Sequence, residues 1–185
     1  GVDIGWLYYP FAFLLIAGFA NAANLADGLD GLAAGSGAVA LLAYAGIAFL
    51  QGETDLALFA SCLTGASVGF LWYNSHPATV FMGDTGSLAL GGTIAMIAIL
   101  IKQELTLLIV GFVFLVEAVS VMIQRGACKV YRWRTGEGLA PEKRPFRMTP
   151  IHHHFEIISK EHAQAEGRSP DSAENSVVIR FWIVS

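Results

Sequence analysis

Long apolar runs dominate the chain, and short polar segments separate them. Three of the runs, 6–23, 31–50 and 56–73, contain no charged side chain. Because a helix rises about 1.5 Å per residue, runs of this length match the roughly 30 Å of hydrocarbon in a bilayer. The pattern therefore predicts a membrane-spanning helix in each of these three places.

Three further runs extend the pattern. The run 87–101 is shorter and uncharged, 105–123 contains the acidic residue Glu117, and 177–185 has the composition of a beginning span. These runs lack the alternation of polar and apolar residues that a membrane β-barrel strand needs. We expect an all-α fold, a polytopic membrane helical bundle in one domain over residues 1–185, with five transmembrane helices plus the start of a sixth. Small residues in 31–46 and 87–92 should let the helix backbones pack closely.

Composition agrees with a membrane protein and excludes other classes. Of the 185 residues, 55% are hydrophobic and 14% are charged, against about 25% charged in an ordinary soluble domain. This apolar excess excludes a disordered chain. Two cysteines are too few for a disulfide framework.

The basic residues are concentrated in one part of the chain. Ten of the eleven follow Gln124, although the net charge of the chain is −4. Basic segments beside membrane spans stay in the cytoplasm, so we expect a cytoplasmic loop over about 125–176. Because each successive span crosses the membrane in the opposite direction, the polar segments 24–30 and 74–86 should lie on the same membrane face as this loop. A nucleic-acid partner is not expected, because the basic residues do not follow a soluble face.

The first polar segment contains Asn24, Asp27 and Asp30, spaced every third residue. On a helix this spacing keeps the three side chains within about 120° of arc, so they could face one cavity. Two carboxylates this close need a cation or a proton between them. The alternative is helix capping, which explains one aspartate but hardly both together with an asparagine.

The second segment contains Phe81, Gly83 and Asp84 just before the fourth apolar run. Glycines beside a helix start let backbone amides approach an anionic ligand, and Asp84 could hold a divalent cation that bridges phosphates. Phe81 offers a ring on which a flat base could stack. A glycine turn with Asp84 as a helix cap and Phe81 at the membrane interface explains the same residues.

The third segment contains three consecutive histidines, His152, His153 and His154. From a loop they could contact phosphate or sugar oxygens; a metal site and an exposed polar loop are the alternatives. Two lesser candidates lie nearby. Glu117 is either a functional acid or a carboxyl hydrogen-bonded between helices, and Gln124 could reach the same cavity.

Carboxylates, a glycine-flanked acid, an aromatic ring and histidines on one membrane face suit phosphoryl transfer with a divalent cation. Several motifs in order resemble the phospho-N-acetylmuramoyl-pentapeptide transferase family, the lipid I synthases of bacterial cell-wall synthesis. This family lies within the wider glycosyltransferase family 4 of polyprenyl-phosphate sugar-1-phosphate transferases. The resemblance covers almost the whole chain and rests on NLADGLDGLAAG, VFMGDTGSLALGG, VEAVSVMIQ, FRMTPIHHHFE and VIRFWI.

The resemblance implies a specific reaction in a specific place. The enzyme would transfer phospho-MurNAc-pentapeptide from UDP-MurNAc-pentapeptide to undecaprenyl phosphate with Mg²⁺ as cofactor, and release UMP. It would be a multi-pass protein of the bacterial inner membrane whose active site faces the cytoplasm. The lipid bilayer is then a further partner, and a homodimer is compatible with the family.

The same resemblance implies roles for individual residues. Asp84 resembles the magnesium-binding aspartate and Phe81 the ring under uracil, with Gly83 between them. The remaining implied contacts line the nucleotide and reaction cavity or border the sugar and peptide: Asn24, Asp27, Asp30, Asn74, Gln124, His152, His153 and His154. Among all of these, the candidate catalytic residues are Asp27, Asp30, Asp84 and His153.

Two departures from the family limit what is expected of this chain. The family's earlier half, with an aspartate pair and a lysine, is absent from the sequence, and the histidine-bearing loop is longer than usual. We therefore expect the C-terminal part of a larger transferase, inactive alone. The competing interpretations are a UDP-N-acetylglucosamine polyprenyl-phosphate transferase and, in a different class, a membrane transporter or metal-handling protein.

Overall fold

The computed structural model describes residues 5–167 and 171–185, and all regular structure in that part of the chain is helical. Within these residues, eight α-helices and two short 3₁₀ helices follow one another. Their bounds are η1 Gly5–Leu7, α1 Tyr8–Ala26, α2 Leu32–Leu50, α3 Thr54–Asn74, α4 Gly83–Leu100, α5 Leu107–Val110, α6 Phe112–Thr135, η2 Pro141–Lys143, α7 Ile151–Ala165 and α8 Asp171–Val184. The all-α prediction is confirmed.

Four helical segments within the described residues are long and apolar enough to cross a membrane: Gly5–Ala26, Leu32–Leu50, Thr54–Asn74 and Gly83–Leu100. They correspond to the first four predicted spans. The fifth predicted span is interrupted at Gly111, which separates α5 from α6. A Cβ at Gly111 would overlap the ring of Phe19 on α1, so this position leaves no room for a side chain. The total number of spans stays a prediction.

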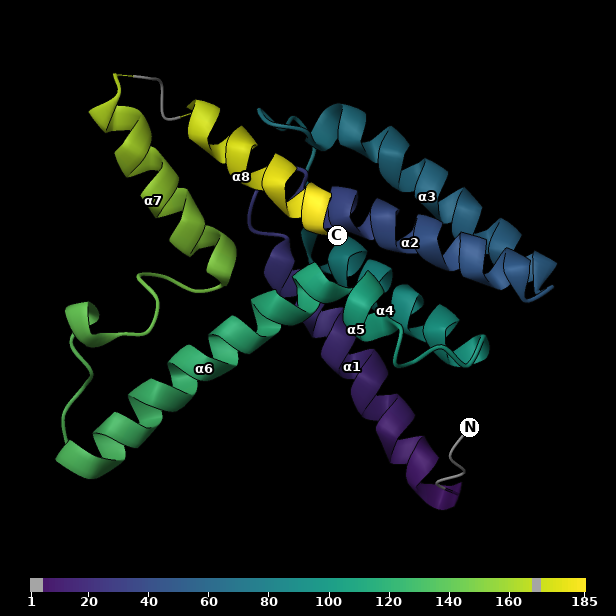
Figure 1. Ribbon diagram of the computed structural model, residues 1–185, viewed down its shortest axis with the longest axis horizontal. Helices are drawn as coiled ribbons and strands as arrows, with labels where there is room; N and C mark the ends of the chain where they lie inside the picture. Colours follow the sequence, from purple (N-terminus) through teal and green to yellow (C-terminus); the bar gives the residue numbers. More distant parts are fainter. Residues whose placement is uncertain (1–4, 168–170) are drawn as a thin grey trace.

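The long helices form two antiparallel pairs. The turn after α2 returns the chain directly as α3, and the two helices pack side by side (Figure 1). Helix α1 packs against α4. Asn24 near the end of α1 contacts Asp84 at the start of α4, whereas Tyr8 at the start of α1 donates to Glu104 beyond the end of α4. The four helices thus place the α1–α2 and α3–α4 connections at one end of the bundle.

Glycines bring these helices close together. A Cβ at Gly91 of α4 would overlap the Phe19 carbonyl oxygen and Ala20 backbone of α1, and one at Gly37 of α2 would overlap Leu90 of α4. Backbones approach this closely only where side chains are absent or small. The predicted role of small residues in helix packing is confirmed at these two crossings.

The last helix returns to the beginning of the chain. The C-terminal end of α8 meets the start of α2 (Figure 1), where a Cβ at Gly35 would overlap the Trp182 ring. The Trp182 indole Nε1 donates to the Gly31 carbonyl oxygen at 3.2 Å. The VIRFWI segment is therefore packed directly on the glycine-rich start of α2.

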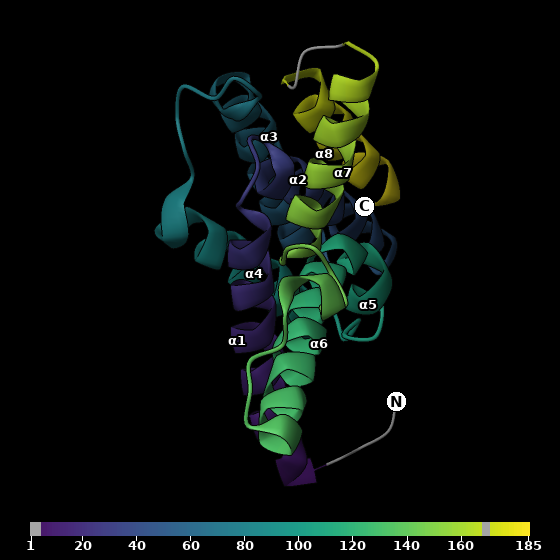
Figure 2. The same cartoon turned by 90° about the vertical axis from the view of Figure 1, so that its left-hand side faces the viewer.

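The segment predicted as a cytoplasmic loop, about 125–176, contains helices among its described residues, and its cytoplasmic side stays a prediction. Helix α6 continues to Thr135, α7 occupies Ile151–Ala165, and α8 begins at Asp171. Residues 151–165 have polar and apolar faces instead of an uninterrupted apolar run. A search for long apolar runs therefore does not detect helix α7. Helices α7 and α8 contact each other at the end of the molecule opposite the N-terminus (Figure 2).

Candidate functional site

Three polar segments meet at one end of the helical bundle. They are the α1–α2 connection, the α3–α4 connection with the first turn of α4, and the first turn of α7. The segments contact one another through Asn24 and Asp84, and through Gly28, where a Cβ would overlap the buried His152 ring. The predicted convergence of the three segments is confirmed.

Asn24 joins α1 to the start of α4. Its side-chain nitrogen donates to the Asp84 carboxylate at 3.0 Å and to the Ser87 hydroxyl oxygen at 2.9 Å. Asp84 is exposed and lies in the first turn of α4, after Gly83, whose φ of +67° is a left-handed conformation. A positive φ is strained for residues other than glycine. Gly83 therefore fixes how the chain enters the helix that carries Asp84.

Asp27 lies at the C-terminal end of α1, partly buried beside this pair. Burial, and then the negative charge of Asp84, raise the pKa of Asp27 from 3.8 to about 6. Two carboxylates that repel each other at a solvent-accessible helix end form an oxygen-donor set that suits a divalent cation such as Mg²⁺. The residues present thus fit the implied magnesium ion, with Asp84 as the exposed ligand.

Asp30 points elsewhere. Its Oδ2 atom lies 3.0 Å from Nδ1 of His76 and accepts a hydrogen bond from the Ala78 backbone nitrogen, also at 3.0 Å. The spacing of Asn24, Asp27 and Asp30 places them on one helix face only if the helix continues through 24–30. This prediction was wrong, because α1 ends at Ala26. Asn24 and Asp27 therefore lie beside Asp84. Asp30 instead contacts the α3–α4 connection.

Asn74 holds two connections together from a buried position at the end of α3. Its Oδ1 accepts a hydrogen bond from the Gly31 nitrogen, and its Nδ2 donates to the Val80 carbonyl oxygen. Gly31 begins α2 with a φ of +77°. Both ends of the Asn74 amide are thus engaged with the backbone, which positions the α1–α2 and α3–α4 connections relative to each other.

The histidines lie in the first turn of α7, not in an irregular loop. His152 and Glu117 of α6 are both fully buried. The Glu117 Oε2 atom accepts a hydrogen bond from the His152 backbone nitrogen at 3.4 Å and lies 3.1 Å from His152 Nδ1, out of line for a second hydrogen bond. Glu117 therefore joins α6 to α7, as expected for a carboxyl hydrogen-bonded between helices.

The other two histidines are half-buried and have separate partners. Nδ1 of His153 lies 2.8 Å from Glu156, which also pairs with Lys160. Burial alone would raise the pKa of Glu156, but the hydrogen bonds from Lys160 and His153 outweigh it and lower the pKa below its usual range. His154 Nδ1 accepts a hydrogen bond from the Arg147 backbone nitrogen. The rings of His152 and His153 lie against each other, with centroids 4.2 Å apart, whereas His154 is engaged with the backbone of Arg147.

Two further candidates border the site. The buried Gln124 on α6 accepts a hydrogen bond from the Phe146 backbone nitrogen through Oε1, which fixes the segment that leads to α7. Phe81 has 73% of its surface exposed, so its ring is accessible to a planar ligand beside Asp84. Neither Glu156 nor Glu174 was predicted from the sequence. Glu174 could have been noticed in the sequence as an acidic residue shortly before the last apolar run, which begins at Val177.

Comparison with known proteins identifies similar chains. Residues 1–102 match the model of glycosyl transferase family 4. The chain is 50% identical to the phospho-N-acetylmuramoyl-pentapeptide-transferase of Shouchella clausii over 184 residues, which cover 100% of this chain and 50% of that protein. It is 49% identical to the protein of the same name from Rubrobacter xylanophilus over 99% of this chain and 48% of that protein. The chain spans about half the length of the curated relatives it matches.

Proposed function

Because the chain belongs to glycosyl transferase family 4, we propose that it forms half of an enzyme that makes lipid I. The reaction would transfer phospho-MurNAc-pentapeptide from UDP-MurNAc-pentapeptide to undecaprenyl phosphate and release UMP. The observation that carries this proposal is the pair of carboxylates, Asp27 and Asp84, together with Asn24 at the end of a bundle of apolar helices. A water-soluble nucleotide and a lipid phosphate can both reach such a position.

Each residue has a chemical task in this proposal. A bound Mg²⁺ would supply positive charge to the pyrophosphate of the nucleotide, and Asp84 and Asp27 would hold the ion. Asn24 orients the Asp84 carboxylate through its hydrogen bond. Phe81 would stack on uracil, and the backbone beside Gly83 can approach phosphate oxygens. His153, oriented by Glu156, would donate to the sugar or phosphate side of the substrate.

We place this site on the cytoplasmic side of the bacterial inner membrane. The support is the basic end of α6, where Arg132 and Arg134 lie in the last turn, because basic residues beside membrane spans stay inside the cell. UDP-linked substrates are cytoplasmic, so the same side suits the donor. A homodimer remains part of the proposal, and sedimentation of the detergent-solubilised chain measures it.

A chimera tests the proposed reaction. The chain would replace the matching half of the Shouchella clausii protein, since they align over 100% of this chain. We expect the chimera to form lipid I and UMP from UDP-MurNAc-pentapeptide, and the 185-residue chain alone to form none. A chimera that melts like its parent but is inert, or that uses only UDP-N-acetylglucosamine, would contradict the proposal. So would ion uptake into vesicles that needs no nucleotide, which indicates a transporter.

Within the same chimera, Asp84→Asn tests the magnesium position. Because the substitution removes a charge at the ion and Asp84 is exposed, turnover should fall by roughly 10²–10³-fold while the melting temperature stays unchanged. Thr85→Ala, the next residue of the same helix, is the matched control and should retain turnover. Near-normal activity of Asp84→Asn at saturating Mg²⁺ would show that Asp84 does not hold the ion.

A further inference from the structure

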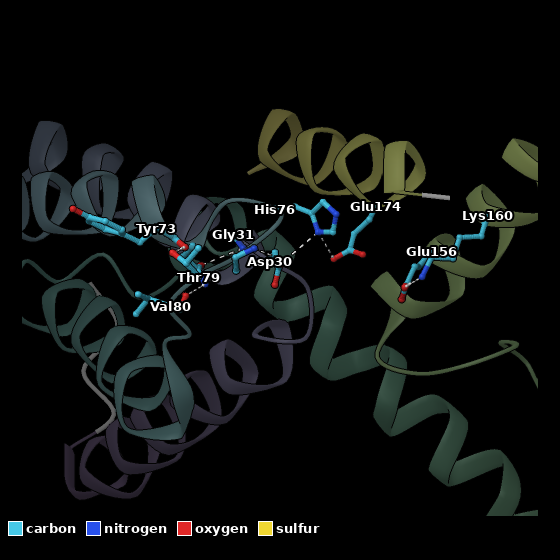
Figure 3. Close-up of polar contacts among 11 residues, drawn as sticks. Asp30, Gly31, Tyr73, His76, Thr79, Val80, Glu156, Lys160 and Glu174 are labelled. Carbon is cyan, nitrogen blue, oxygen red and sulfur yellow. Dashed lines mark hydrogen bonds and ion pairs between the residues drawn. The ribbon is translucent and has the colours of Figure 1, made fainter. Parts of the chain in front are cut away.

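A second cluster of metal-ligating side chains includes Asp30 of the α1–α2 connection and does not include Asp84. Nδ1 of His76 lies 3.0 Å from Asp30 Oδ2 and 3.5 Å from Glu174 Oε1. These three atoms all lie within 4.8 Å of one another. Figure 3 shows His76 between the two carboxylates, with the same ring nitrogen facing both. The three residues come from the α1–α2 connection, the α3–α4 connection and α8.

The spacing of the donor atoms matches that around one metal ion. Ligands bound tetrahedrally at about 2.1 Å lie roughly 3.4 Å apart, and the two distances to Nδ1 lie on either side of this value. All three side chains are partly buried, between 16% and 20% exposed. The site is therefore held by the fold yet open enough for water to complete the coordination.

Hydrogen bonding alone accounts for only part of the arrangement. Nδ1 of an imidazole carries one proton at most, so it cannot donate fully to two carboxylates. Asp30 Oδ2 already accepts from the Ala78 nitrogen, and 3.5 Å to Glu174 exceeds an ordinary N–H···O bond. The carboxylates of Asp30 and Glu174 repel each other beside His76 Nδ1, and a bound cation would reduce this repulsion.

We propose that Asp30, His76 and Glu174 form a binding site for a transition metal ion of the Zn²⁺ class. One imidazole nitrogen and two carboxylate oxygens are a donor set that zinc accepts, whereas Mg²⁺ prefers oxygen ligands alone. The ion would join α8 to the two connections that carry Asp27 and Asn74. This site is separate from the magnesium position and does not depend on the proposed reaction.

Zinc titration of the full chain tests the proposal. Chain without an affinity tag, stripped of metal in detergent, would be titrated with ZnCl₂ by calorimetry. We expect one binding event whose affinity falls at least ~10-fold in His76→Gln and in the isosteric Glu174→Gln, because each removes one ligand. Exposed residues of α7 supply matched controls, His162→Gln and Glu161→Gln, which should keep that event. His152, His153 and His154 are present in all five proteins and give the same background.

Two further measurements make the outcome decisive. Co²⁺ as the probe should give a visible absorption band that is lost in both cluster variants and kept in both controls. An unchanged zinc isotherm in His76→Gln and Glu174→Gln would overturn the proposal. The melting temperature without metal checks that the variants are folded. If His76→Lys keeps that melting temperature while zinc binding is the same in all proteins, the cluster is an ion pair and the proposal is wrong.

Discussion

At the scale of single residues, Asp27 illustrates how a binding site costs stability. Its pKa of about 6 in the folded chain lies above the 3.8 of an ordinary aspartate. A carboxyl whose pKa is raised on folding favours the folded state at low pH, and this contribution disappears as the pH rises through the folded pKa. The ionised Asp27 therefore destabilises the chain above about pH 6.

This gives a prediction for Asp27→Asn. The substitution should stabilise the chain at pH 8 by roughly 1 kcal/mol and have little effect at pH 4. The full pKa shift corresponds to about 3 kcal/mol, which we reduce because the side chain is only partly buried. Melting curves at the two pH values measure it, and Asp55→Asn in the first turn of α3 is the control. Equal stabilisation at both pH values would contradict the electrostatic cause.

The buried pair of Glu117 and His152 predicts energetic coupling between α6 and α7. A double-mutant cycle with Glu117→Gln and His152→Asn should give a coupling energy of about 1–3 kcal/mol, because both side chains are fully buried. The exposed pair of Arg147 and Glu161 is the comparison and should couple by less than about 1 kcal/mol. Unfolding in denaturant measures both cycles. Coupling no larger than that of the exposed pair would show that the contact between the two side chains does not hold the helices together, since the hydrogen bond from the His152 backbone nitrogen is kept in His152→Asn.

At the scale of elements, the crossing of α1 and α4 depends on one glycine. Gly91→Ala should destabilise the chain by about 1–3 kcal/mol, because the added Cβ would overlap the α1 backbone. Gly92→Ala, one residue further, meets only the Ala20 Cβ at 3.9 Å and should be neutral or slightly stabilising. Thermal melting in detergent compares the two. If they behave alike, helix propensity and not the crossing determines the result.

The elements also show what hydrophobic pattern can and cannot predict. The first four apolar runs form helices, because their length and apolar character determine this. The three polar segments meet at one end, because successive spans cross the membrane in opposite directions. The bounds of helices depended on tertiary contacts that no local pattern contains. Gly111 interrupts a predicted span beside Phe19, and α1 stops at Ala26, so Asp30 turns toward His76. The roles of the individual site residues stay predictions.

At the scale of the whole molecule, contacts between distant segments assemble the candidate site. Gly31, with its positive φ, donates to Asn74 through its nitrogen and accepts from Trp182 through its oxygen. One residue thus receives a contact from α3 and another from α8. We expect Trp182→Phe, which removes the donor and keeps most of the ring, to lower the free energy of unfolding by about 1 kcal/mol. Denaturant unfolding measures this, and Trp72→Phe, an exposed tryptophan on α3, should have little effect.

The contact between Trp182 and Gly31 joins residues 151 positions apart, which has a consequence for the order of synthesis. A ribosome adds about 5–20 residues each second. Trp182 is therefore synthesised on the order of 10 s after Gly31 of the α1–α2 connection. During that interval the connection between α1 and α2 lacks both the indole and Glu174. We therefore expect this surface of the nascent chain to stay uncovered by α8 until residue 182 has been synthesised.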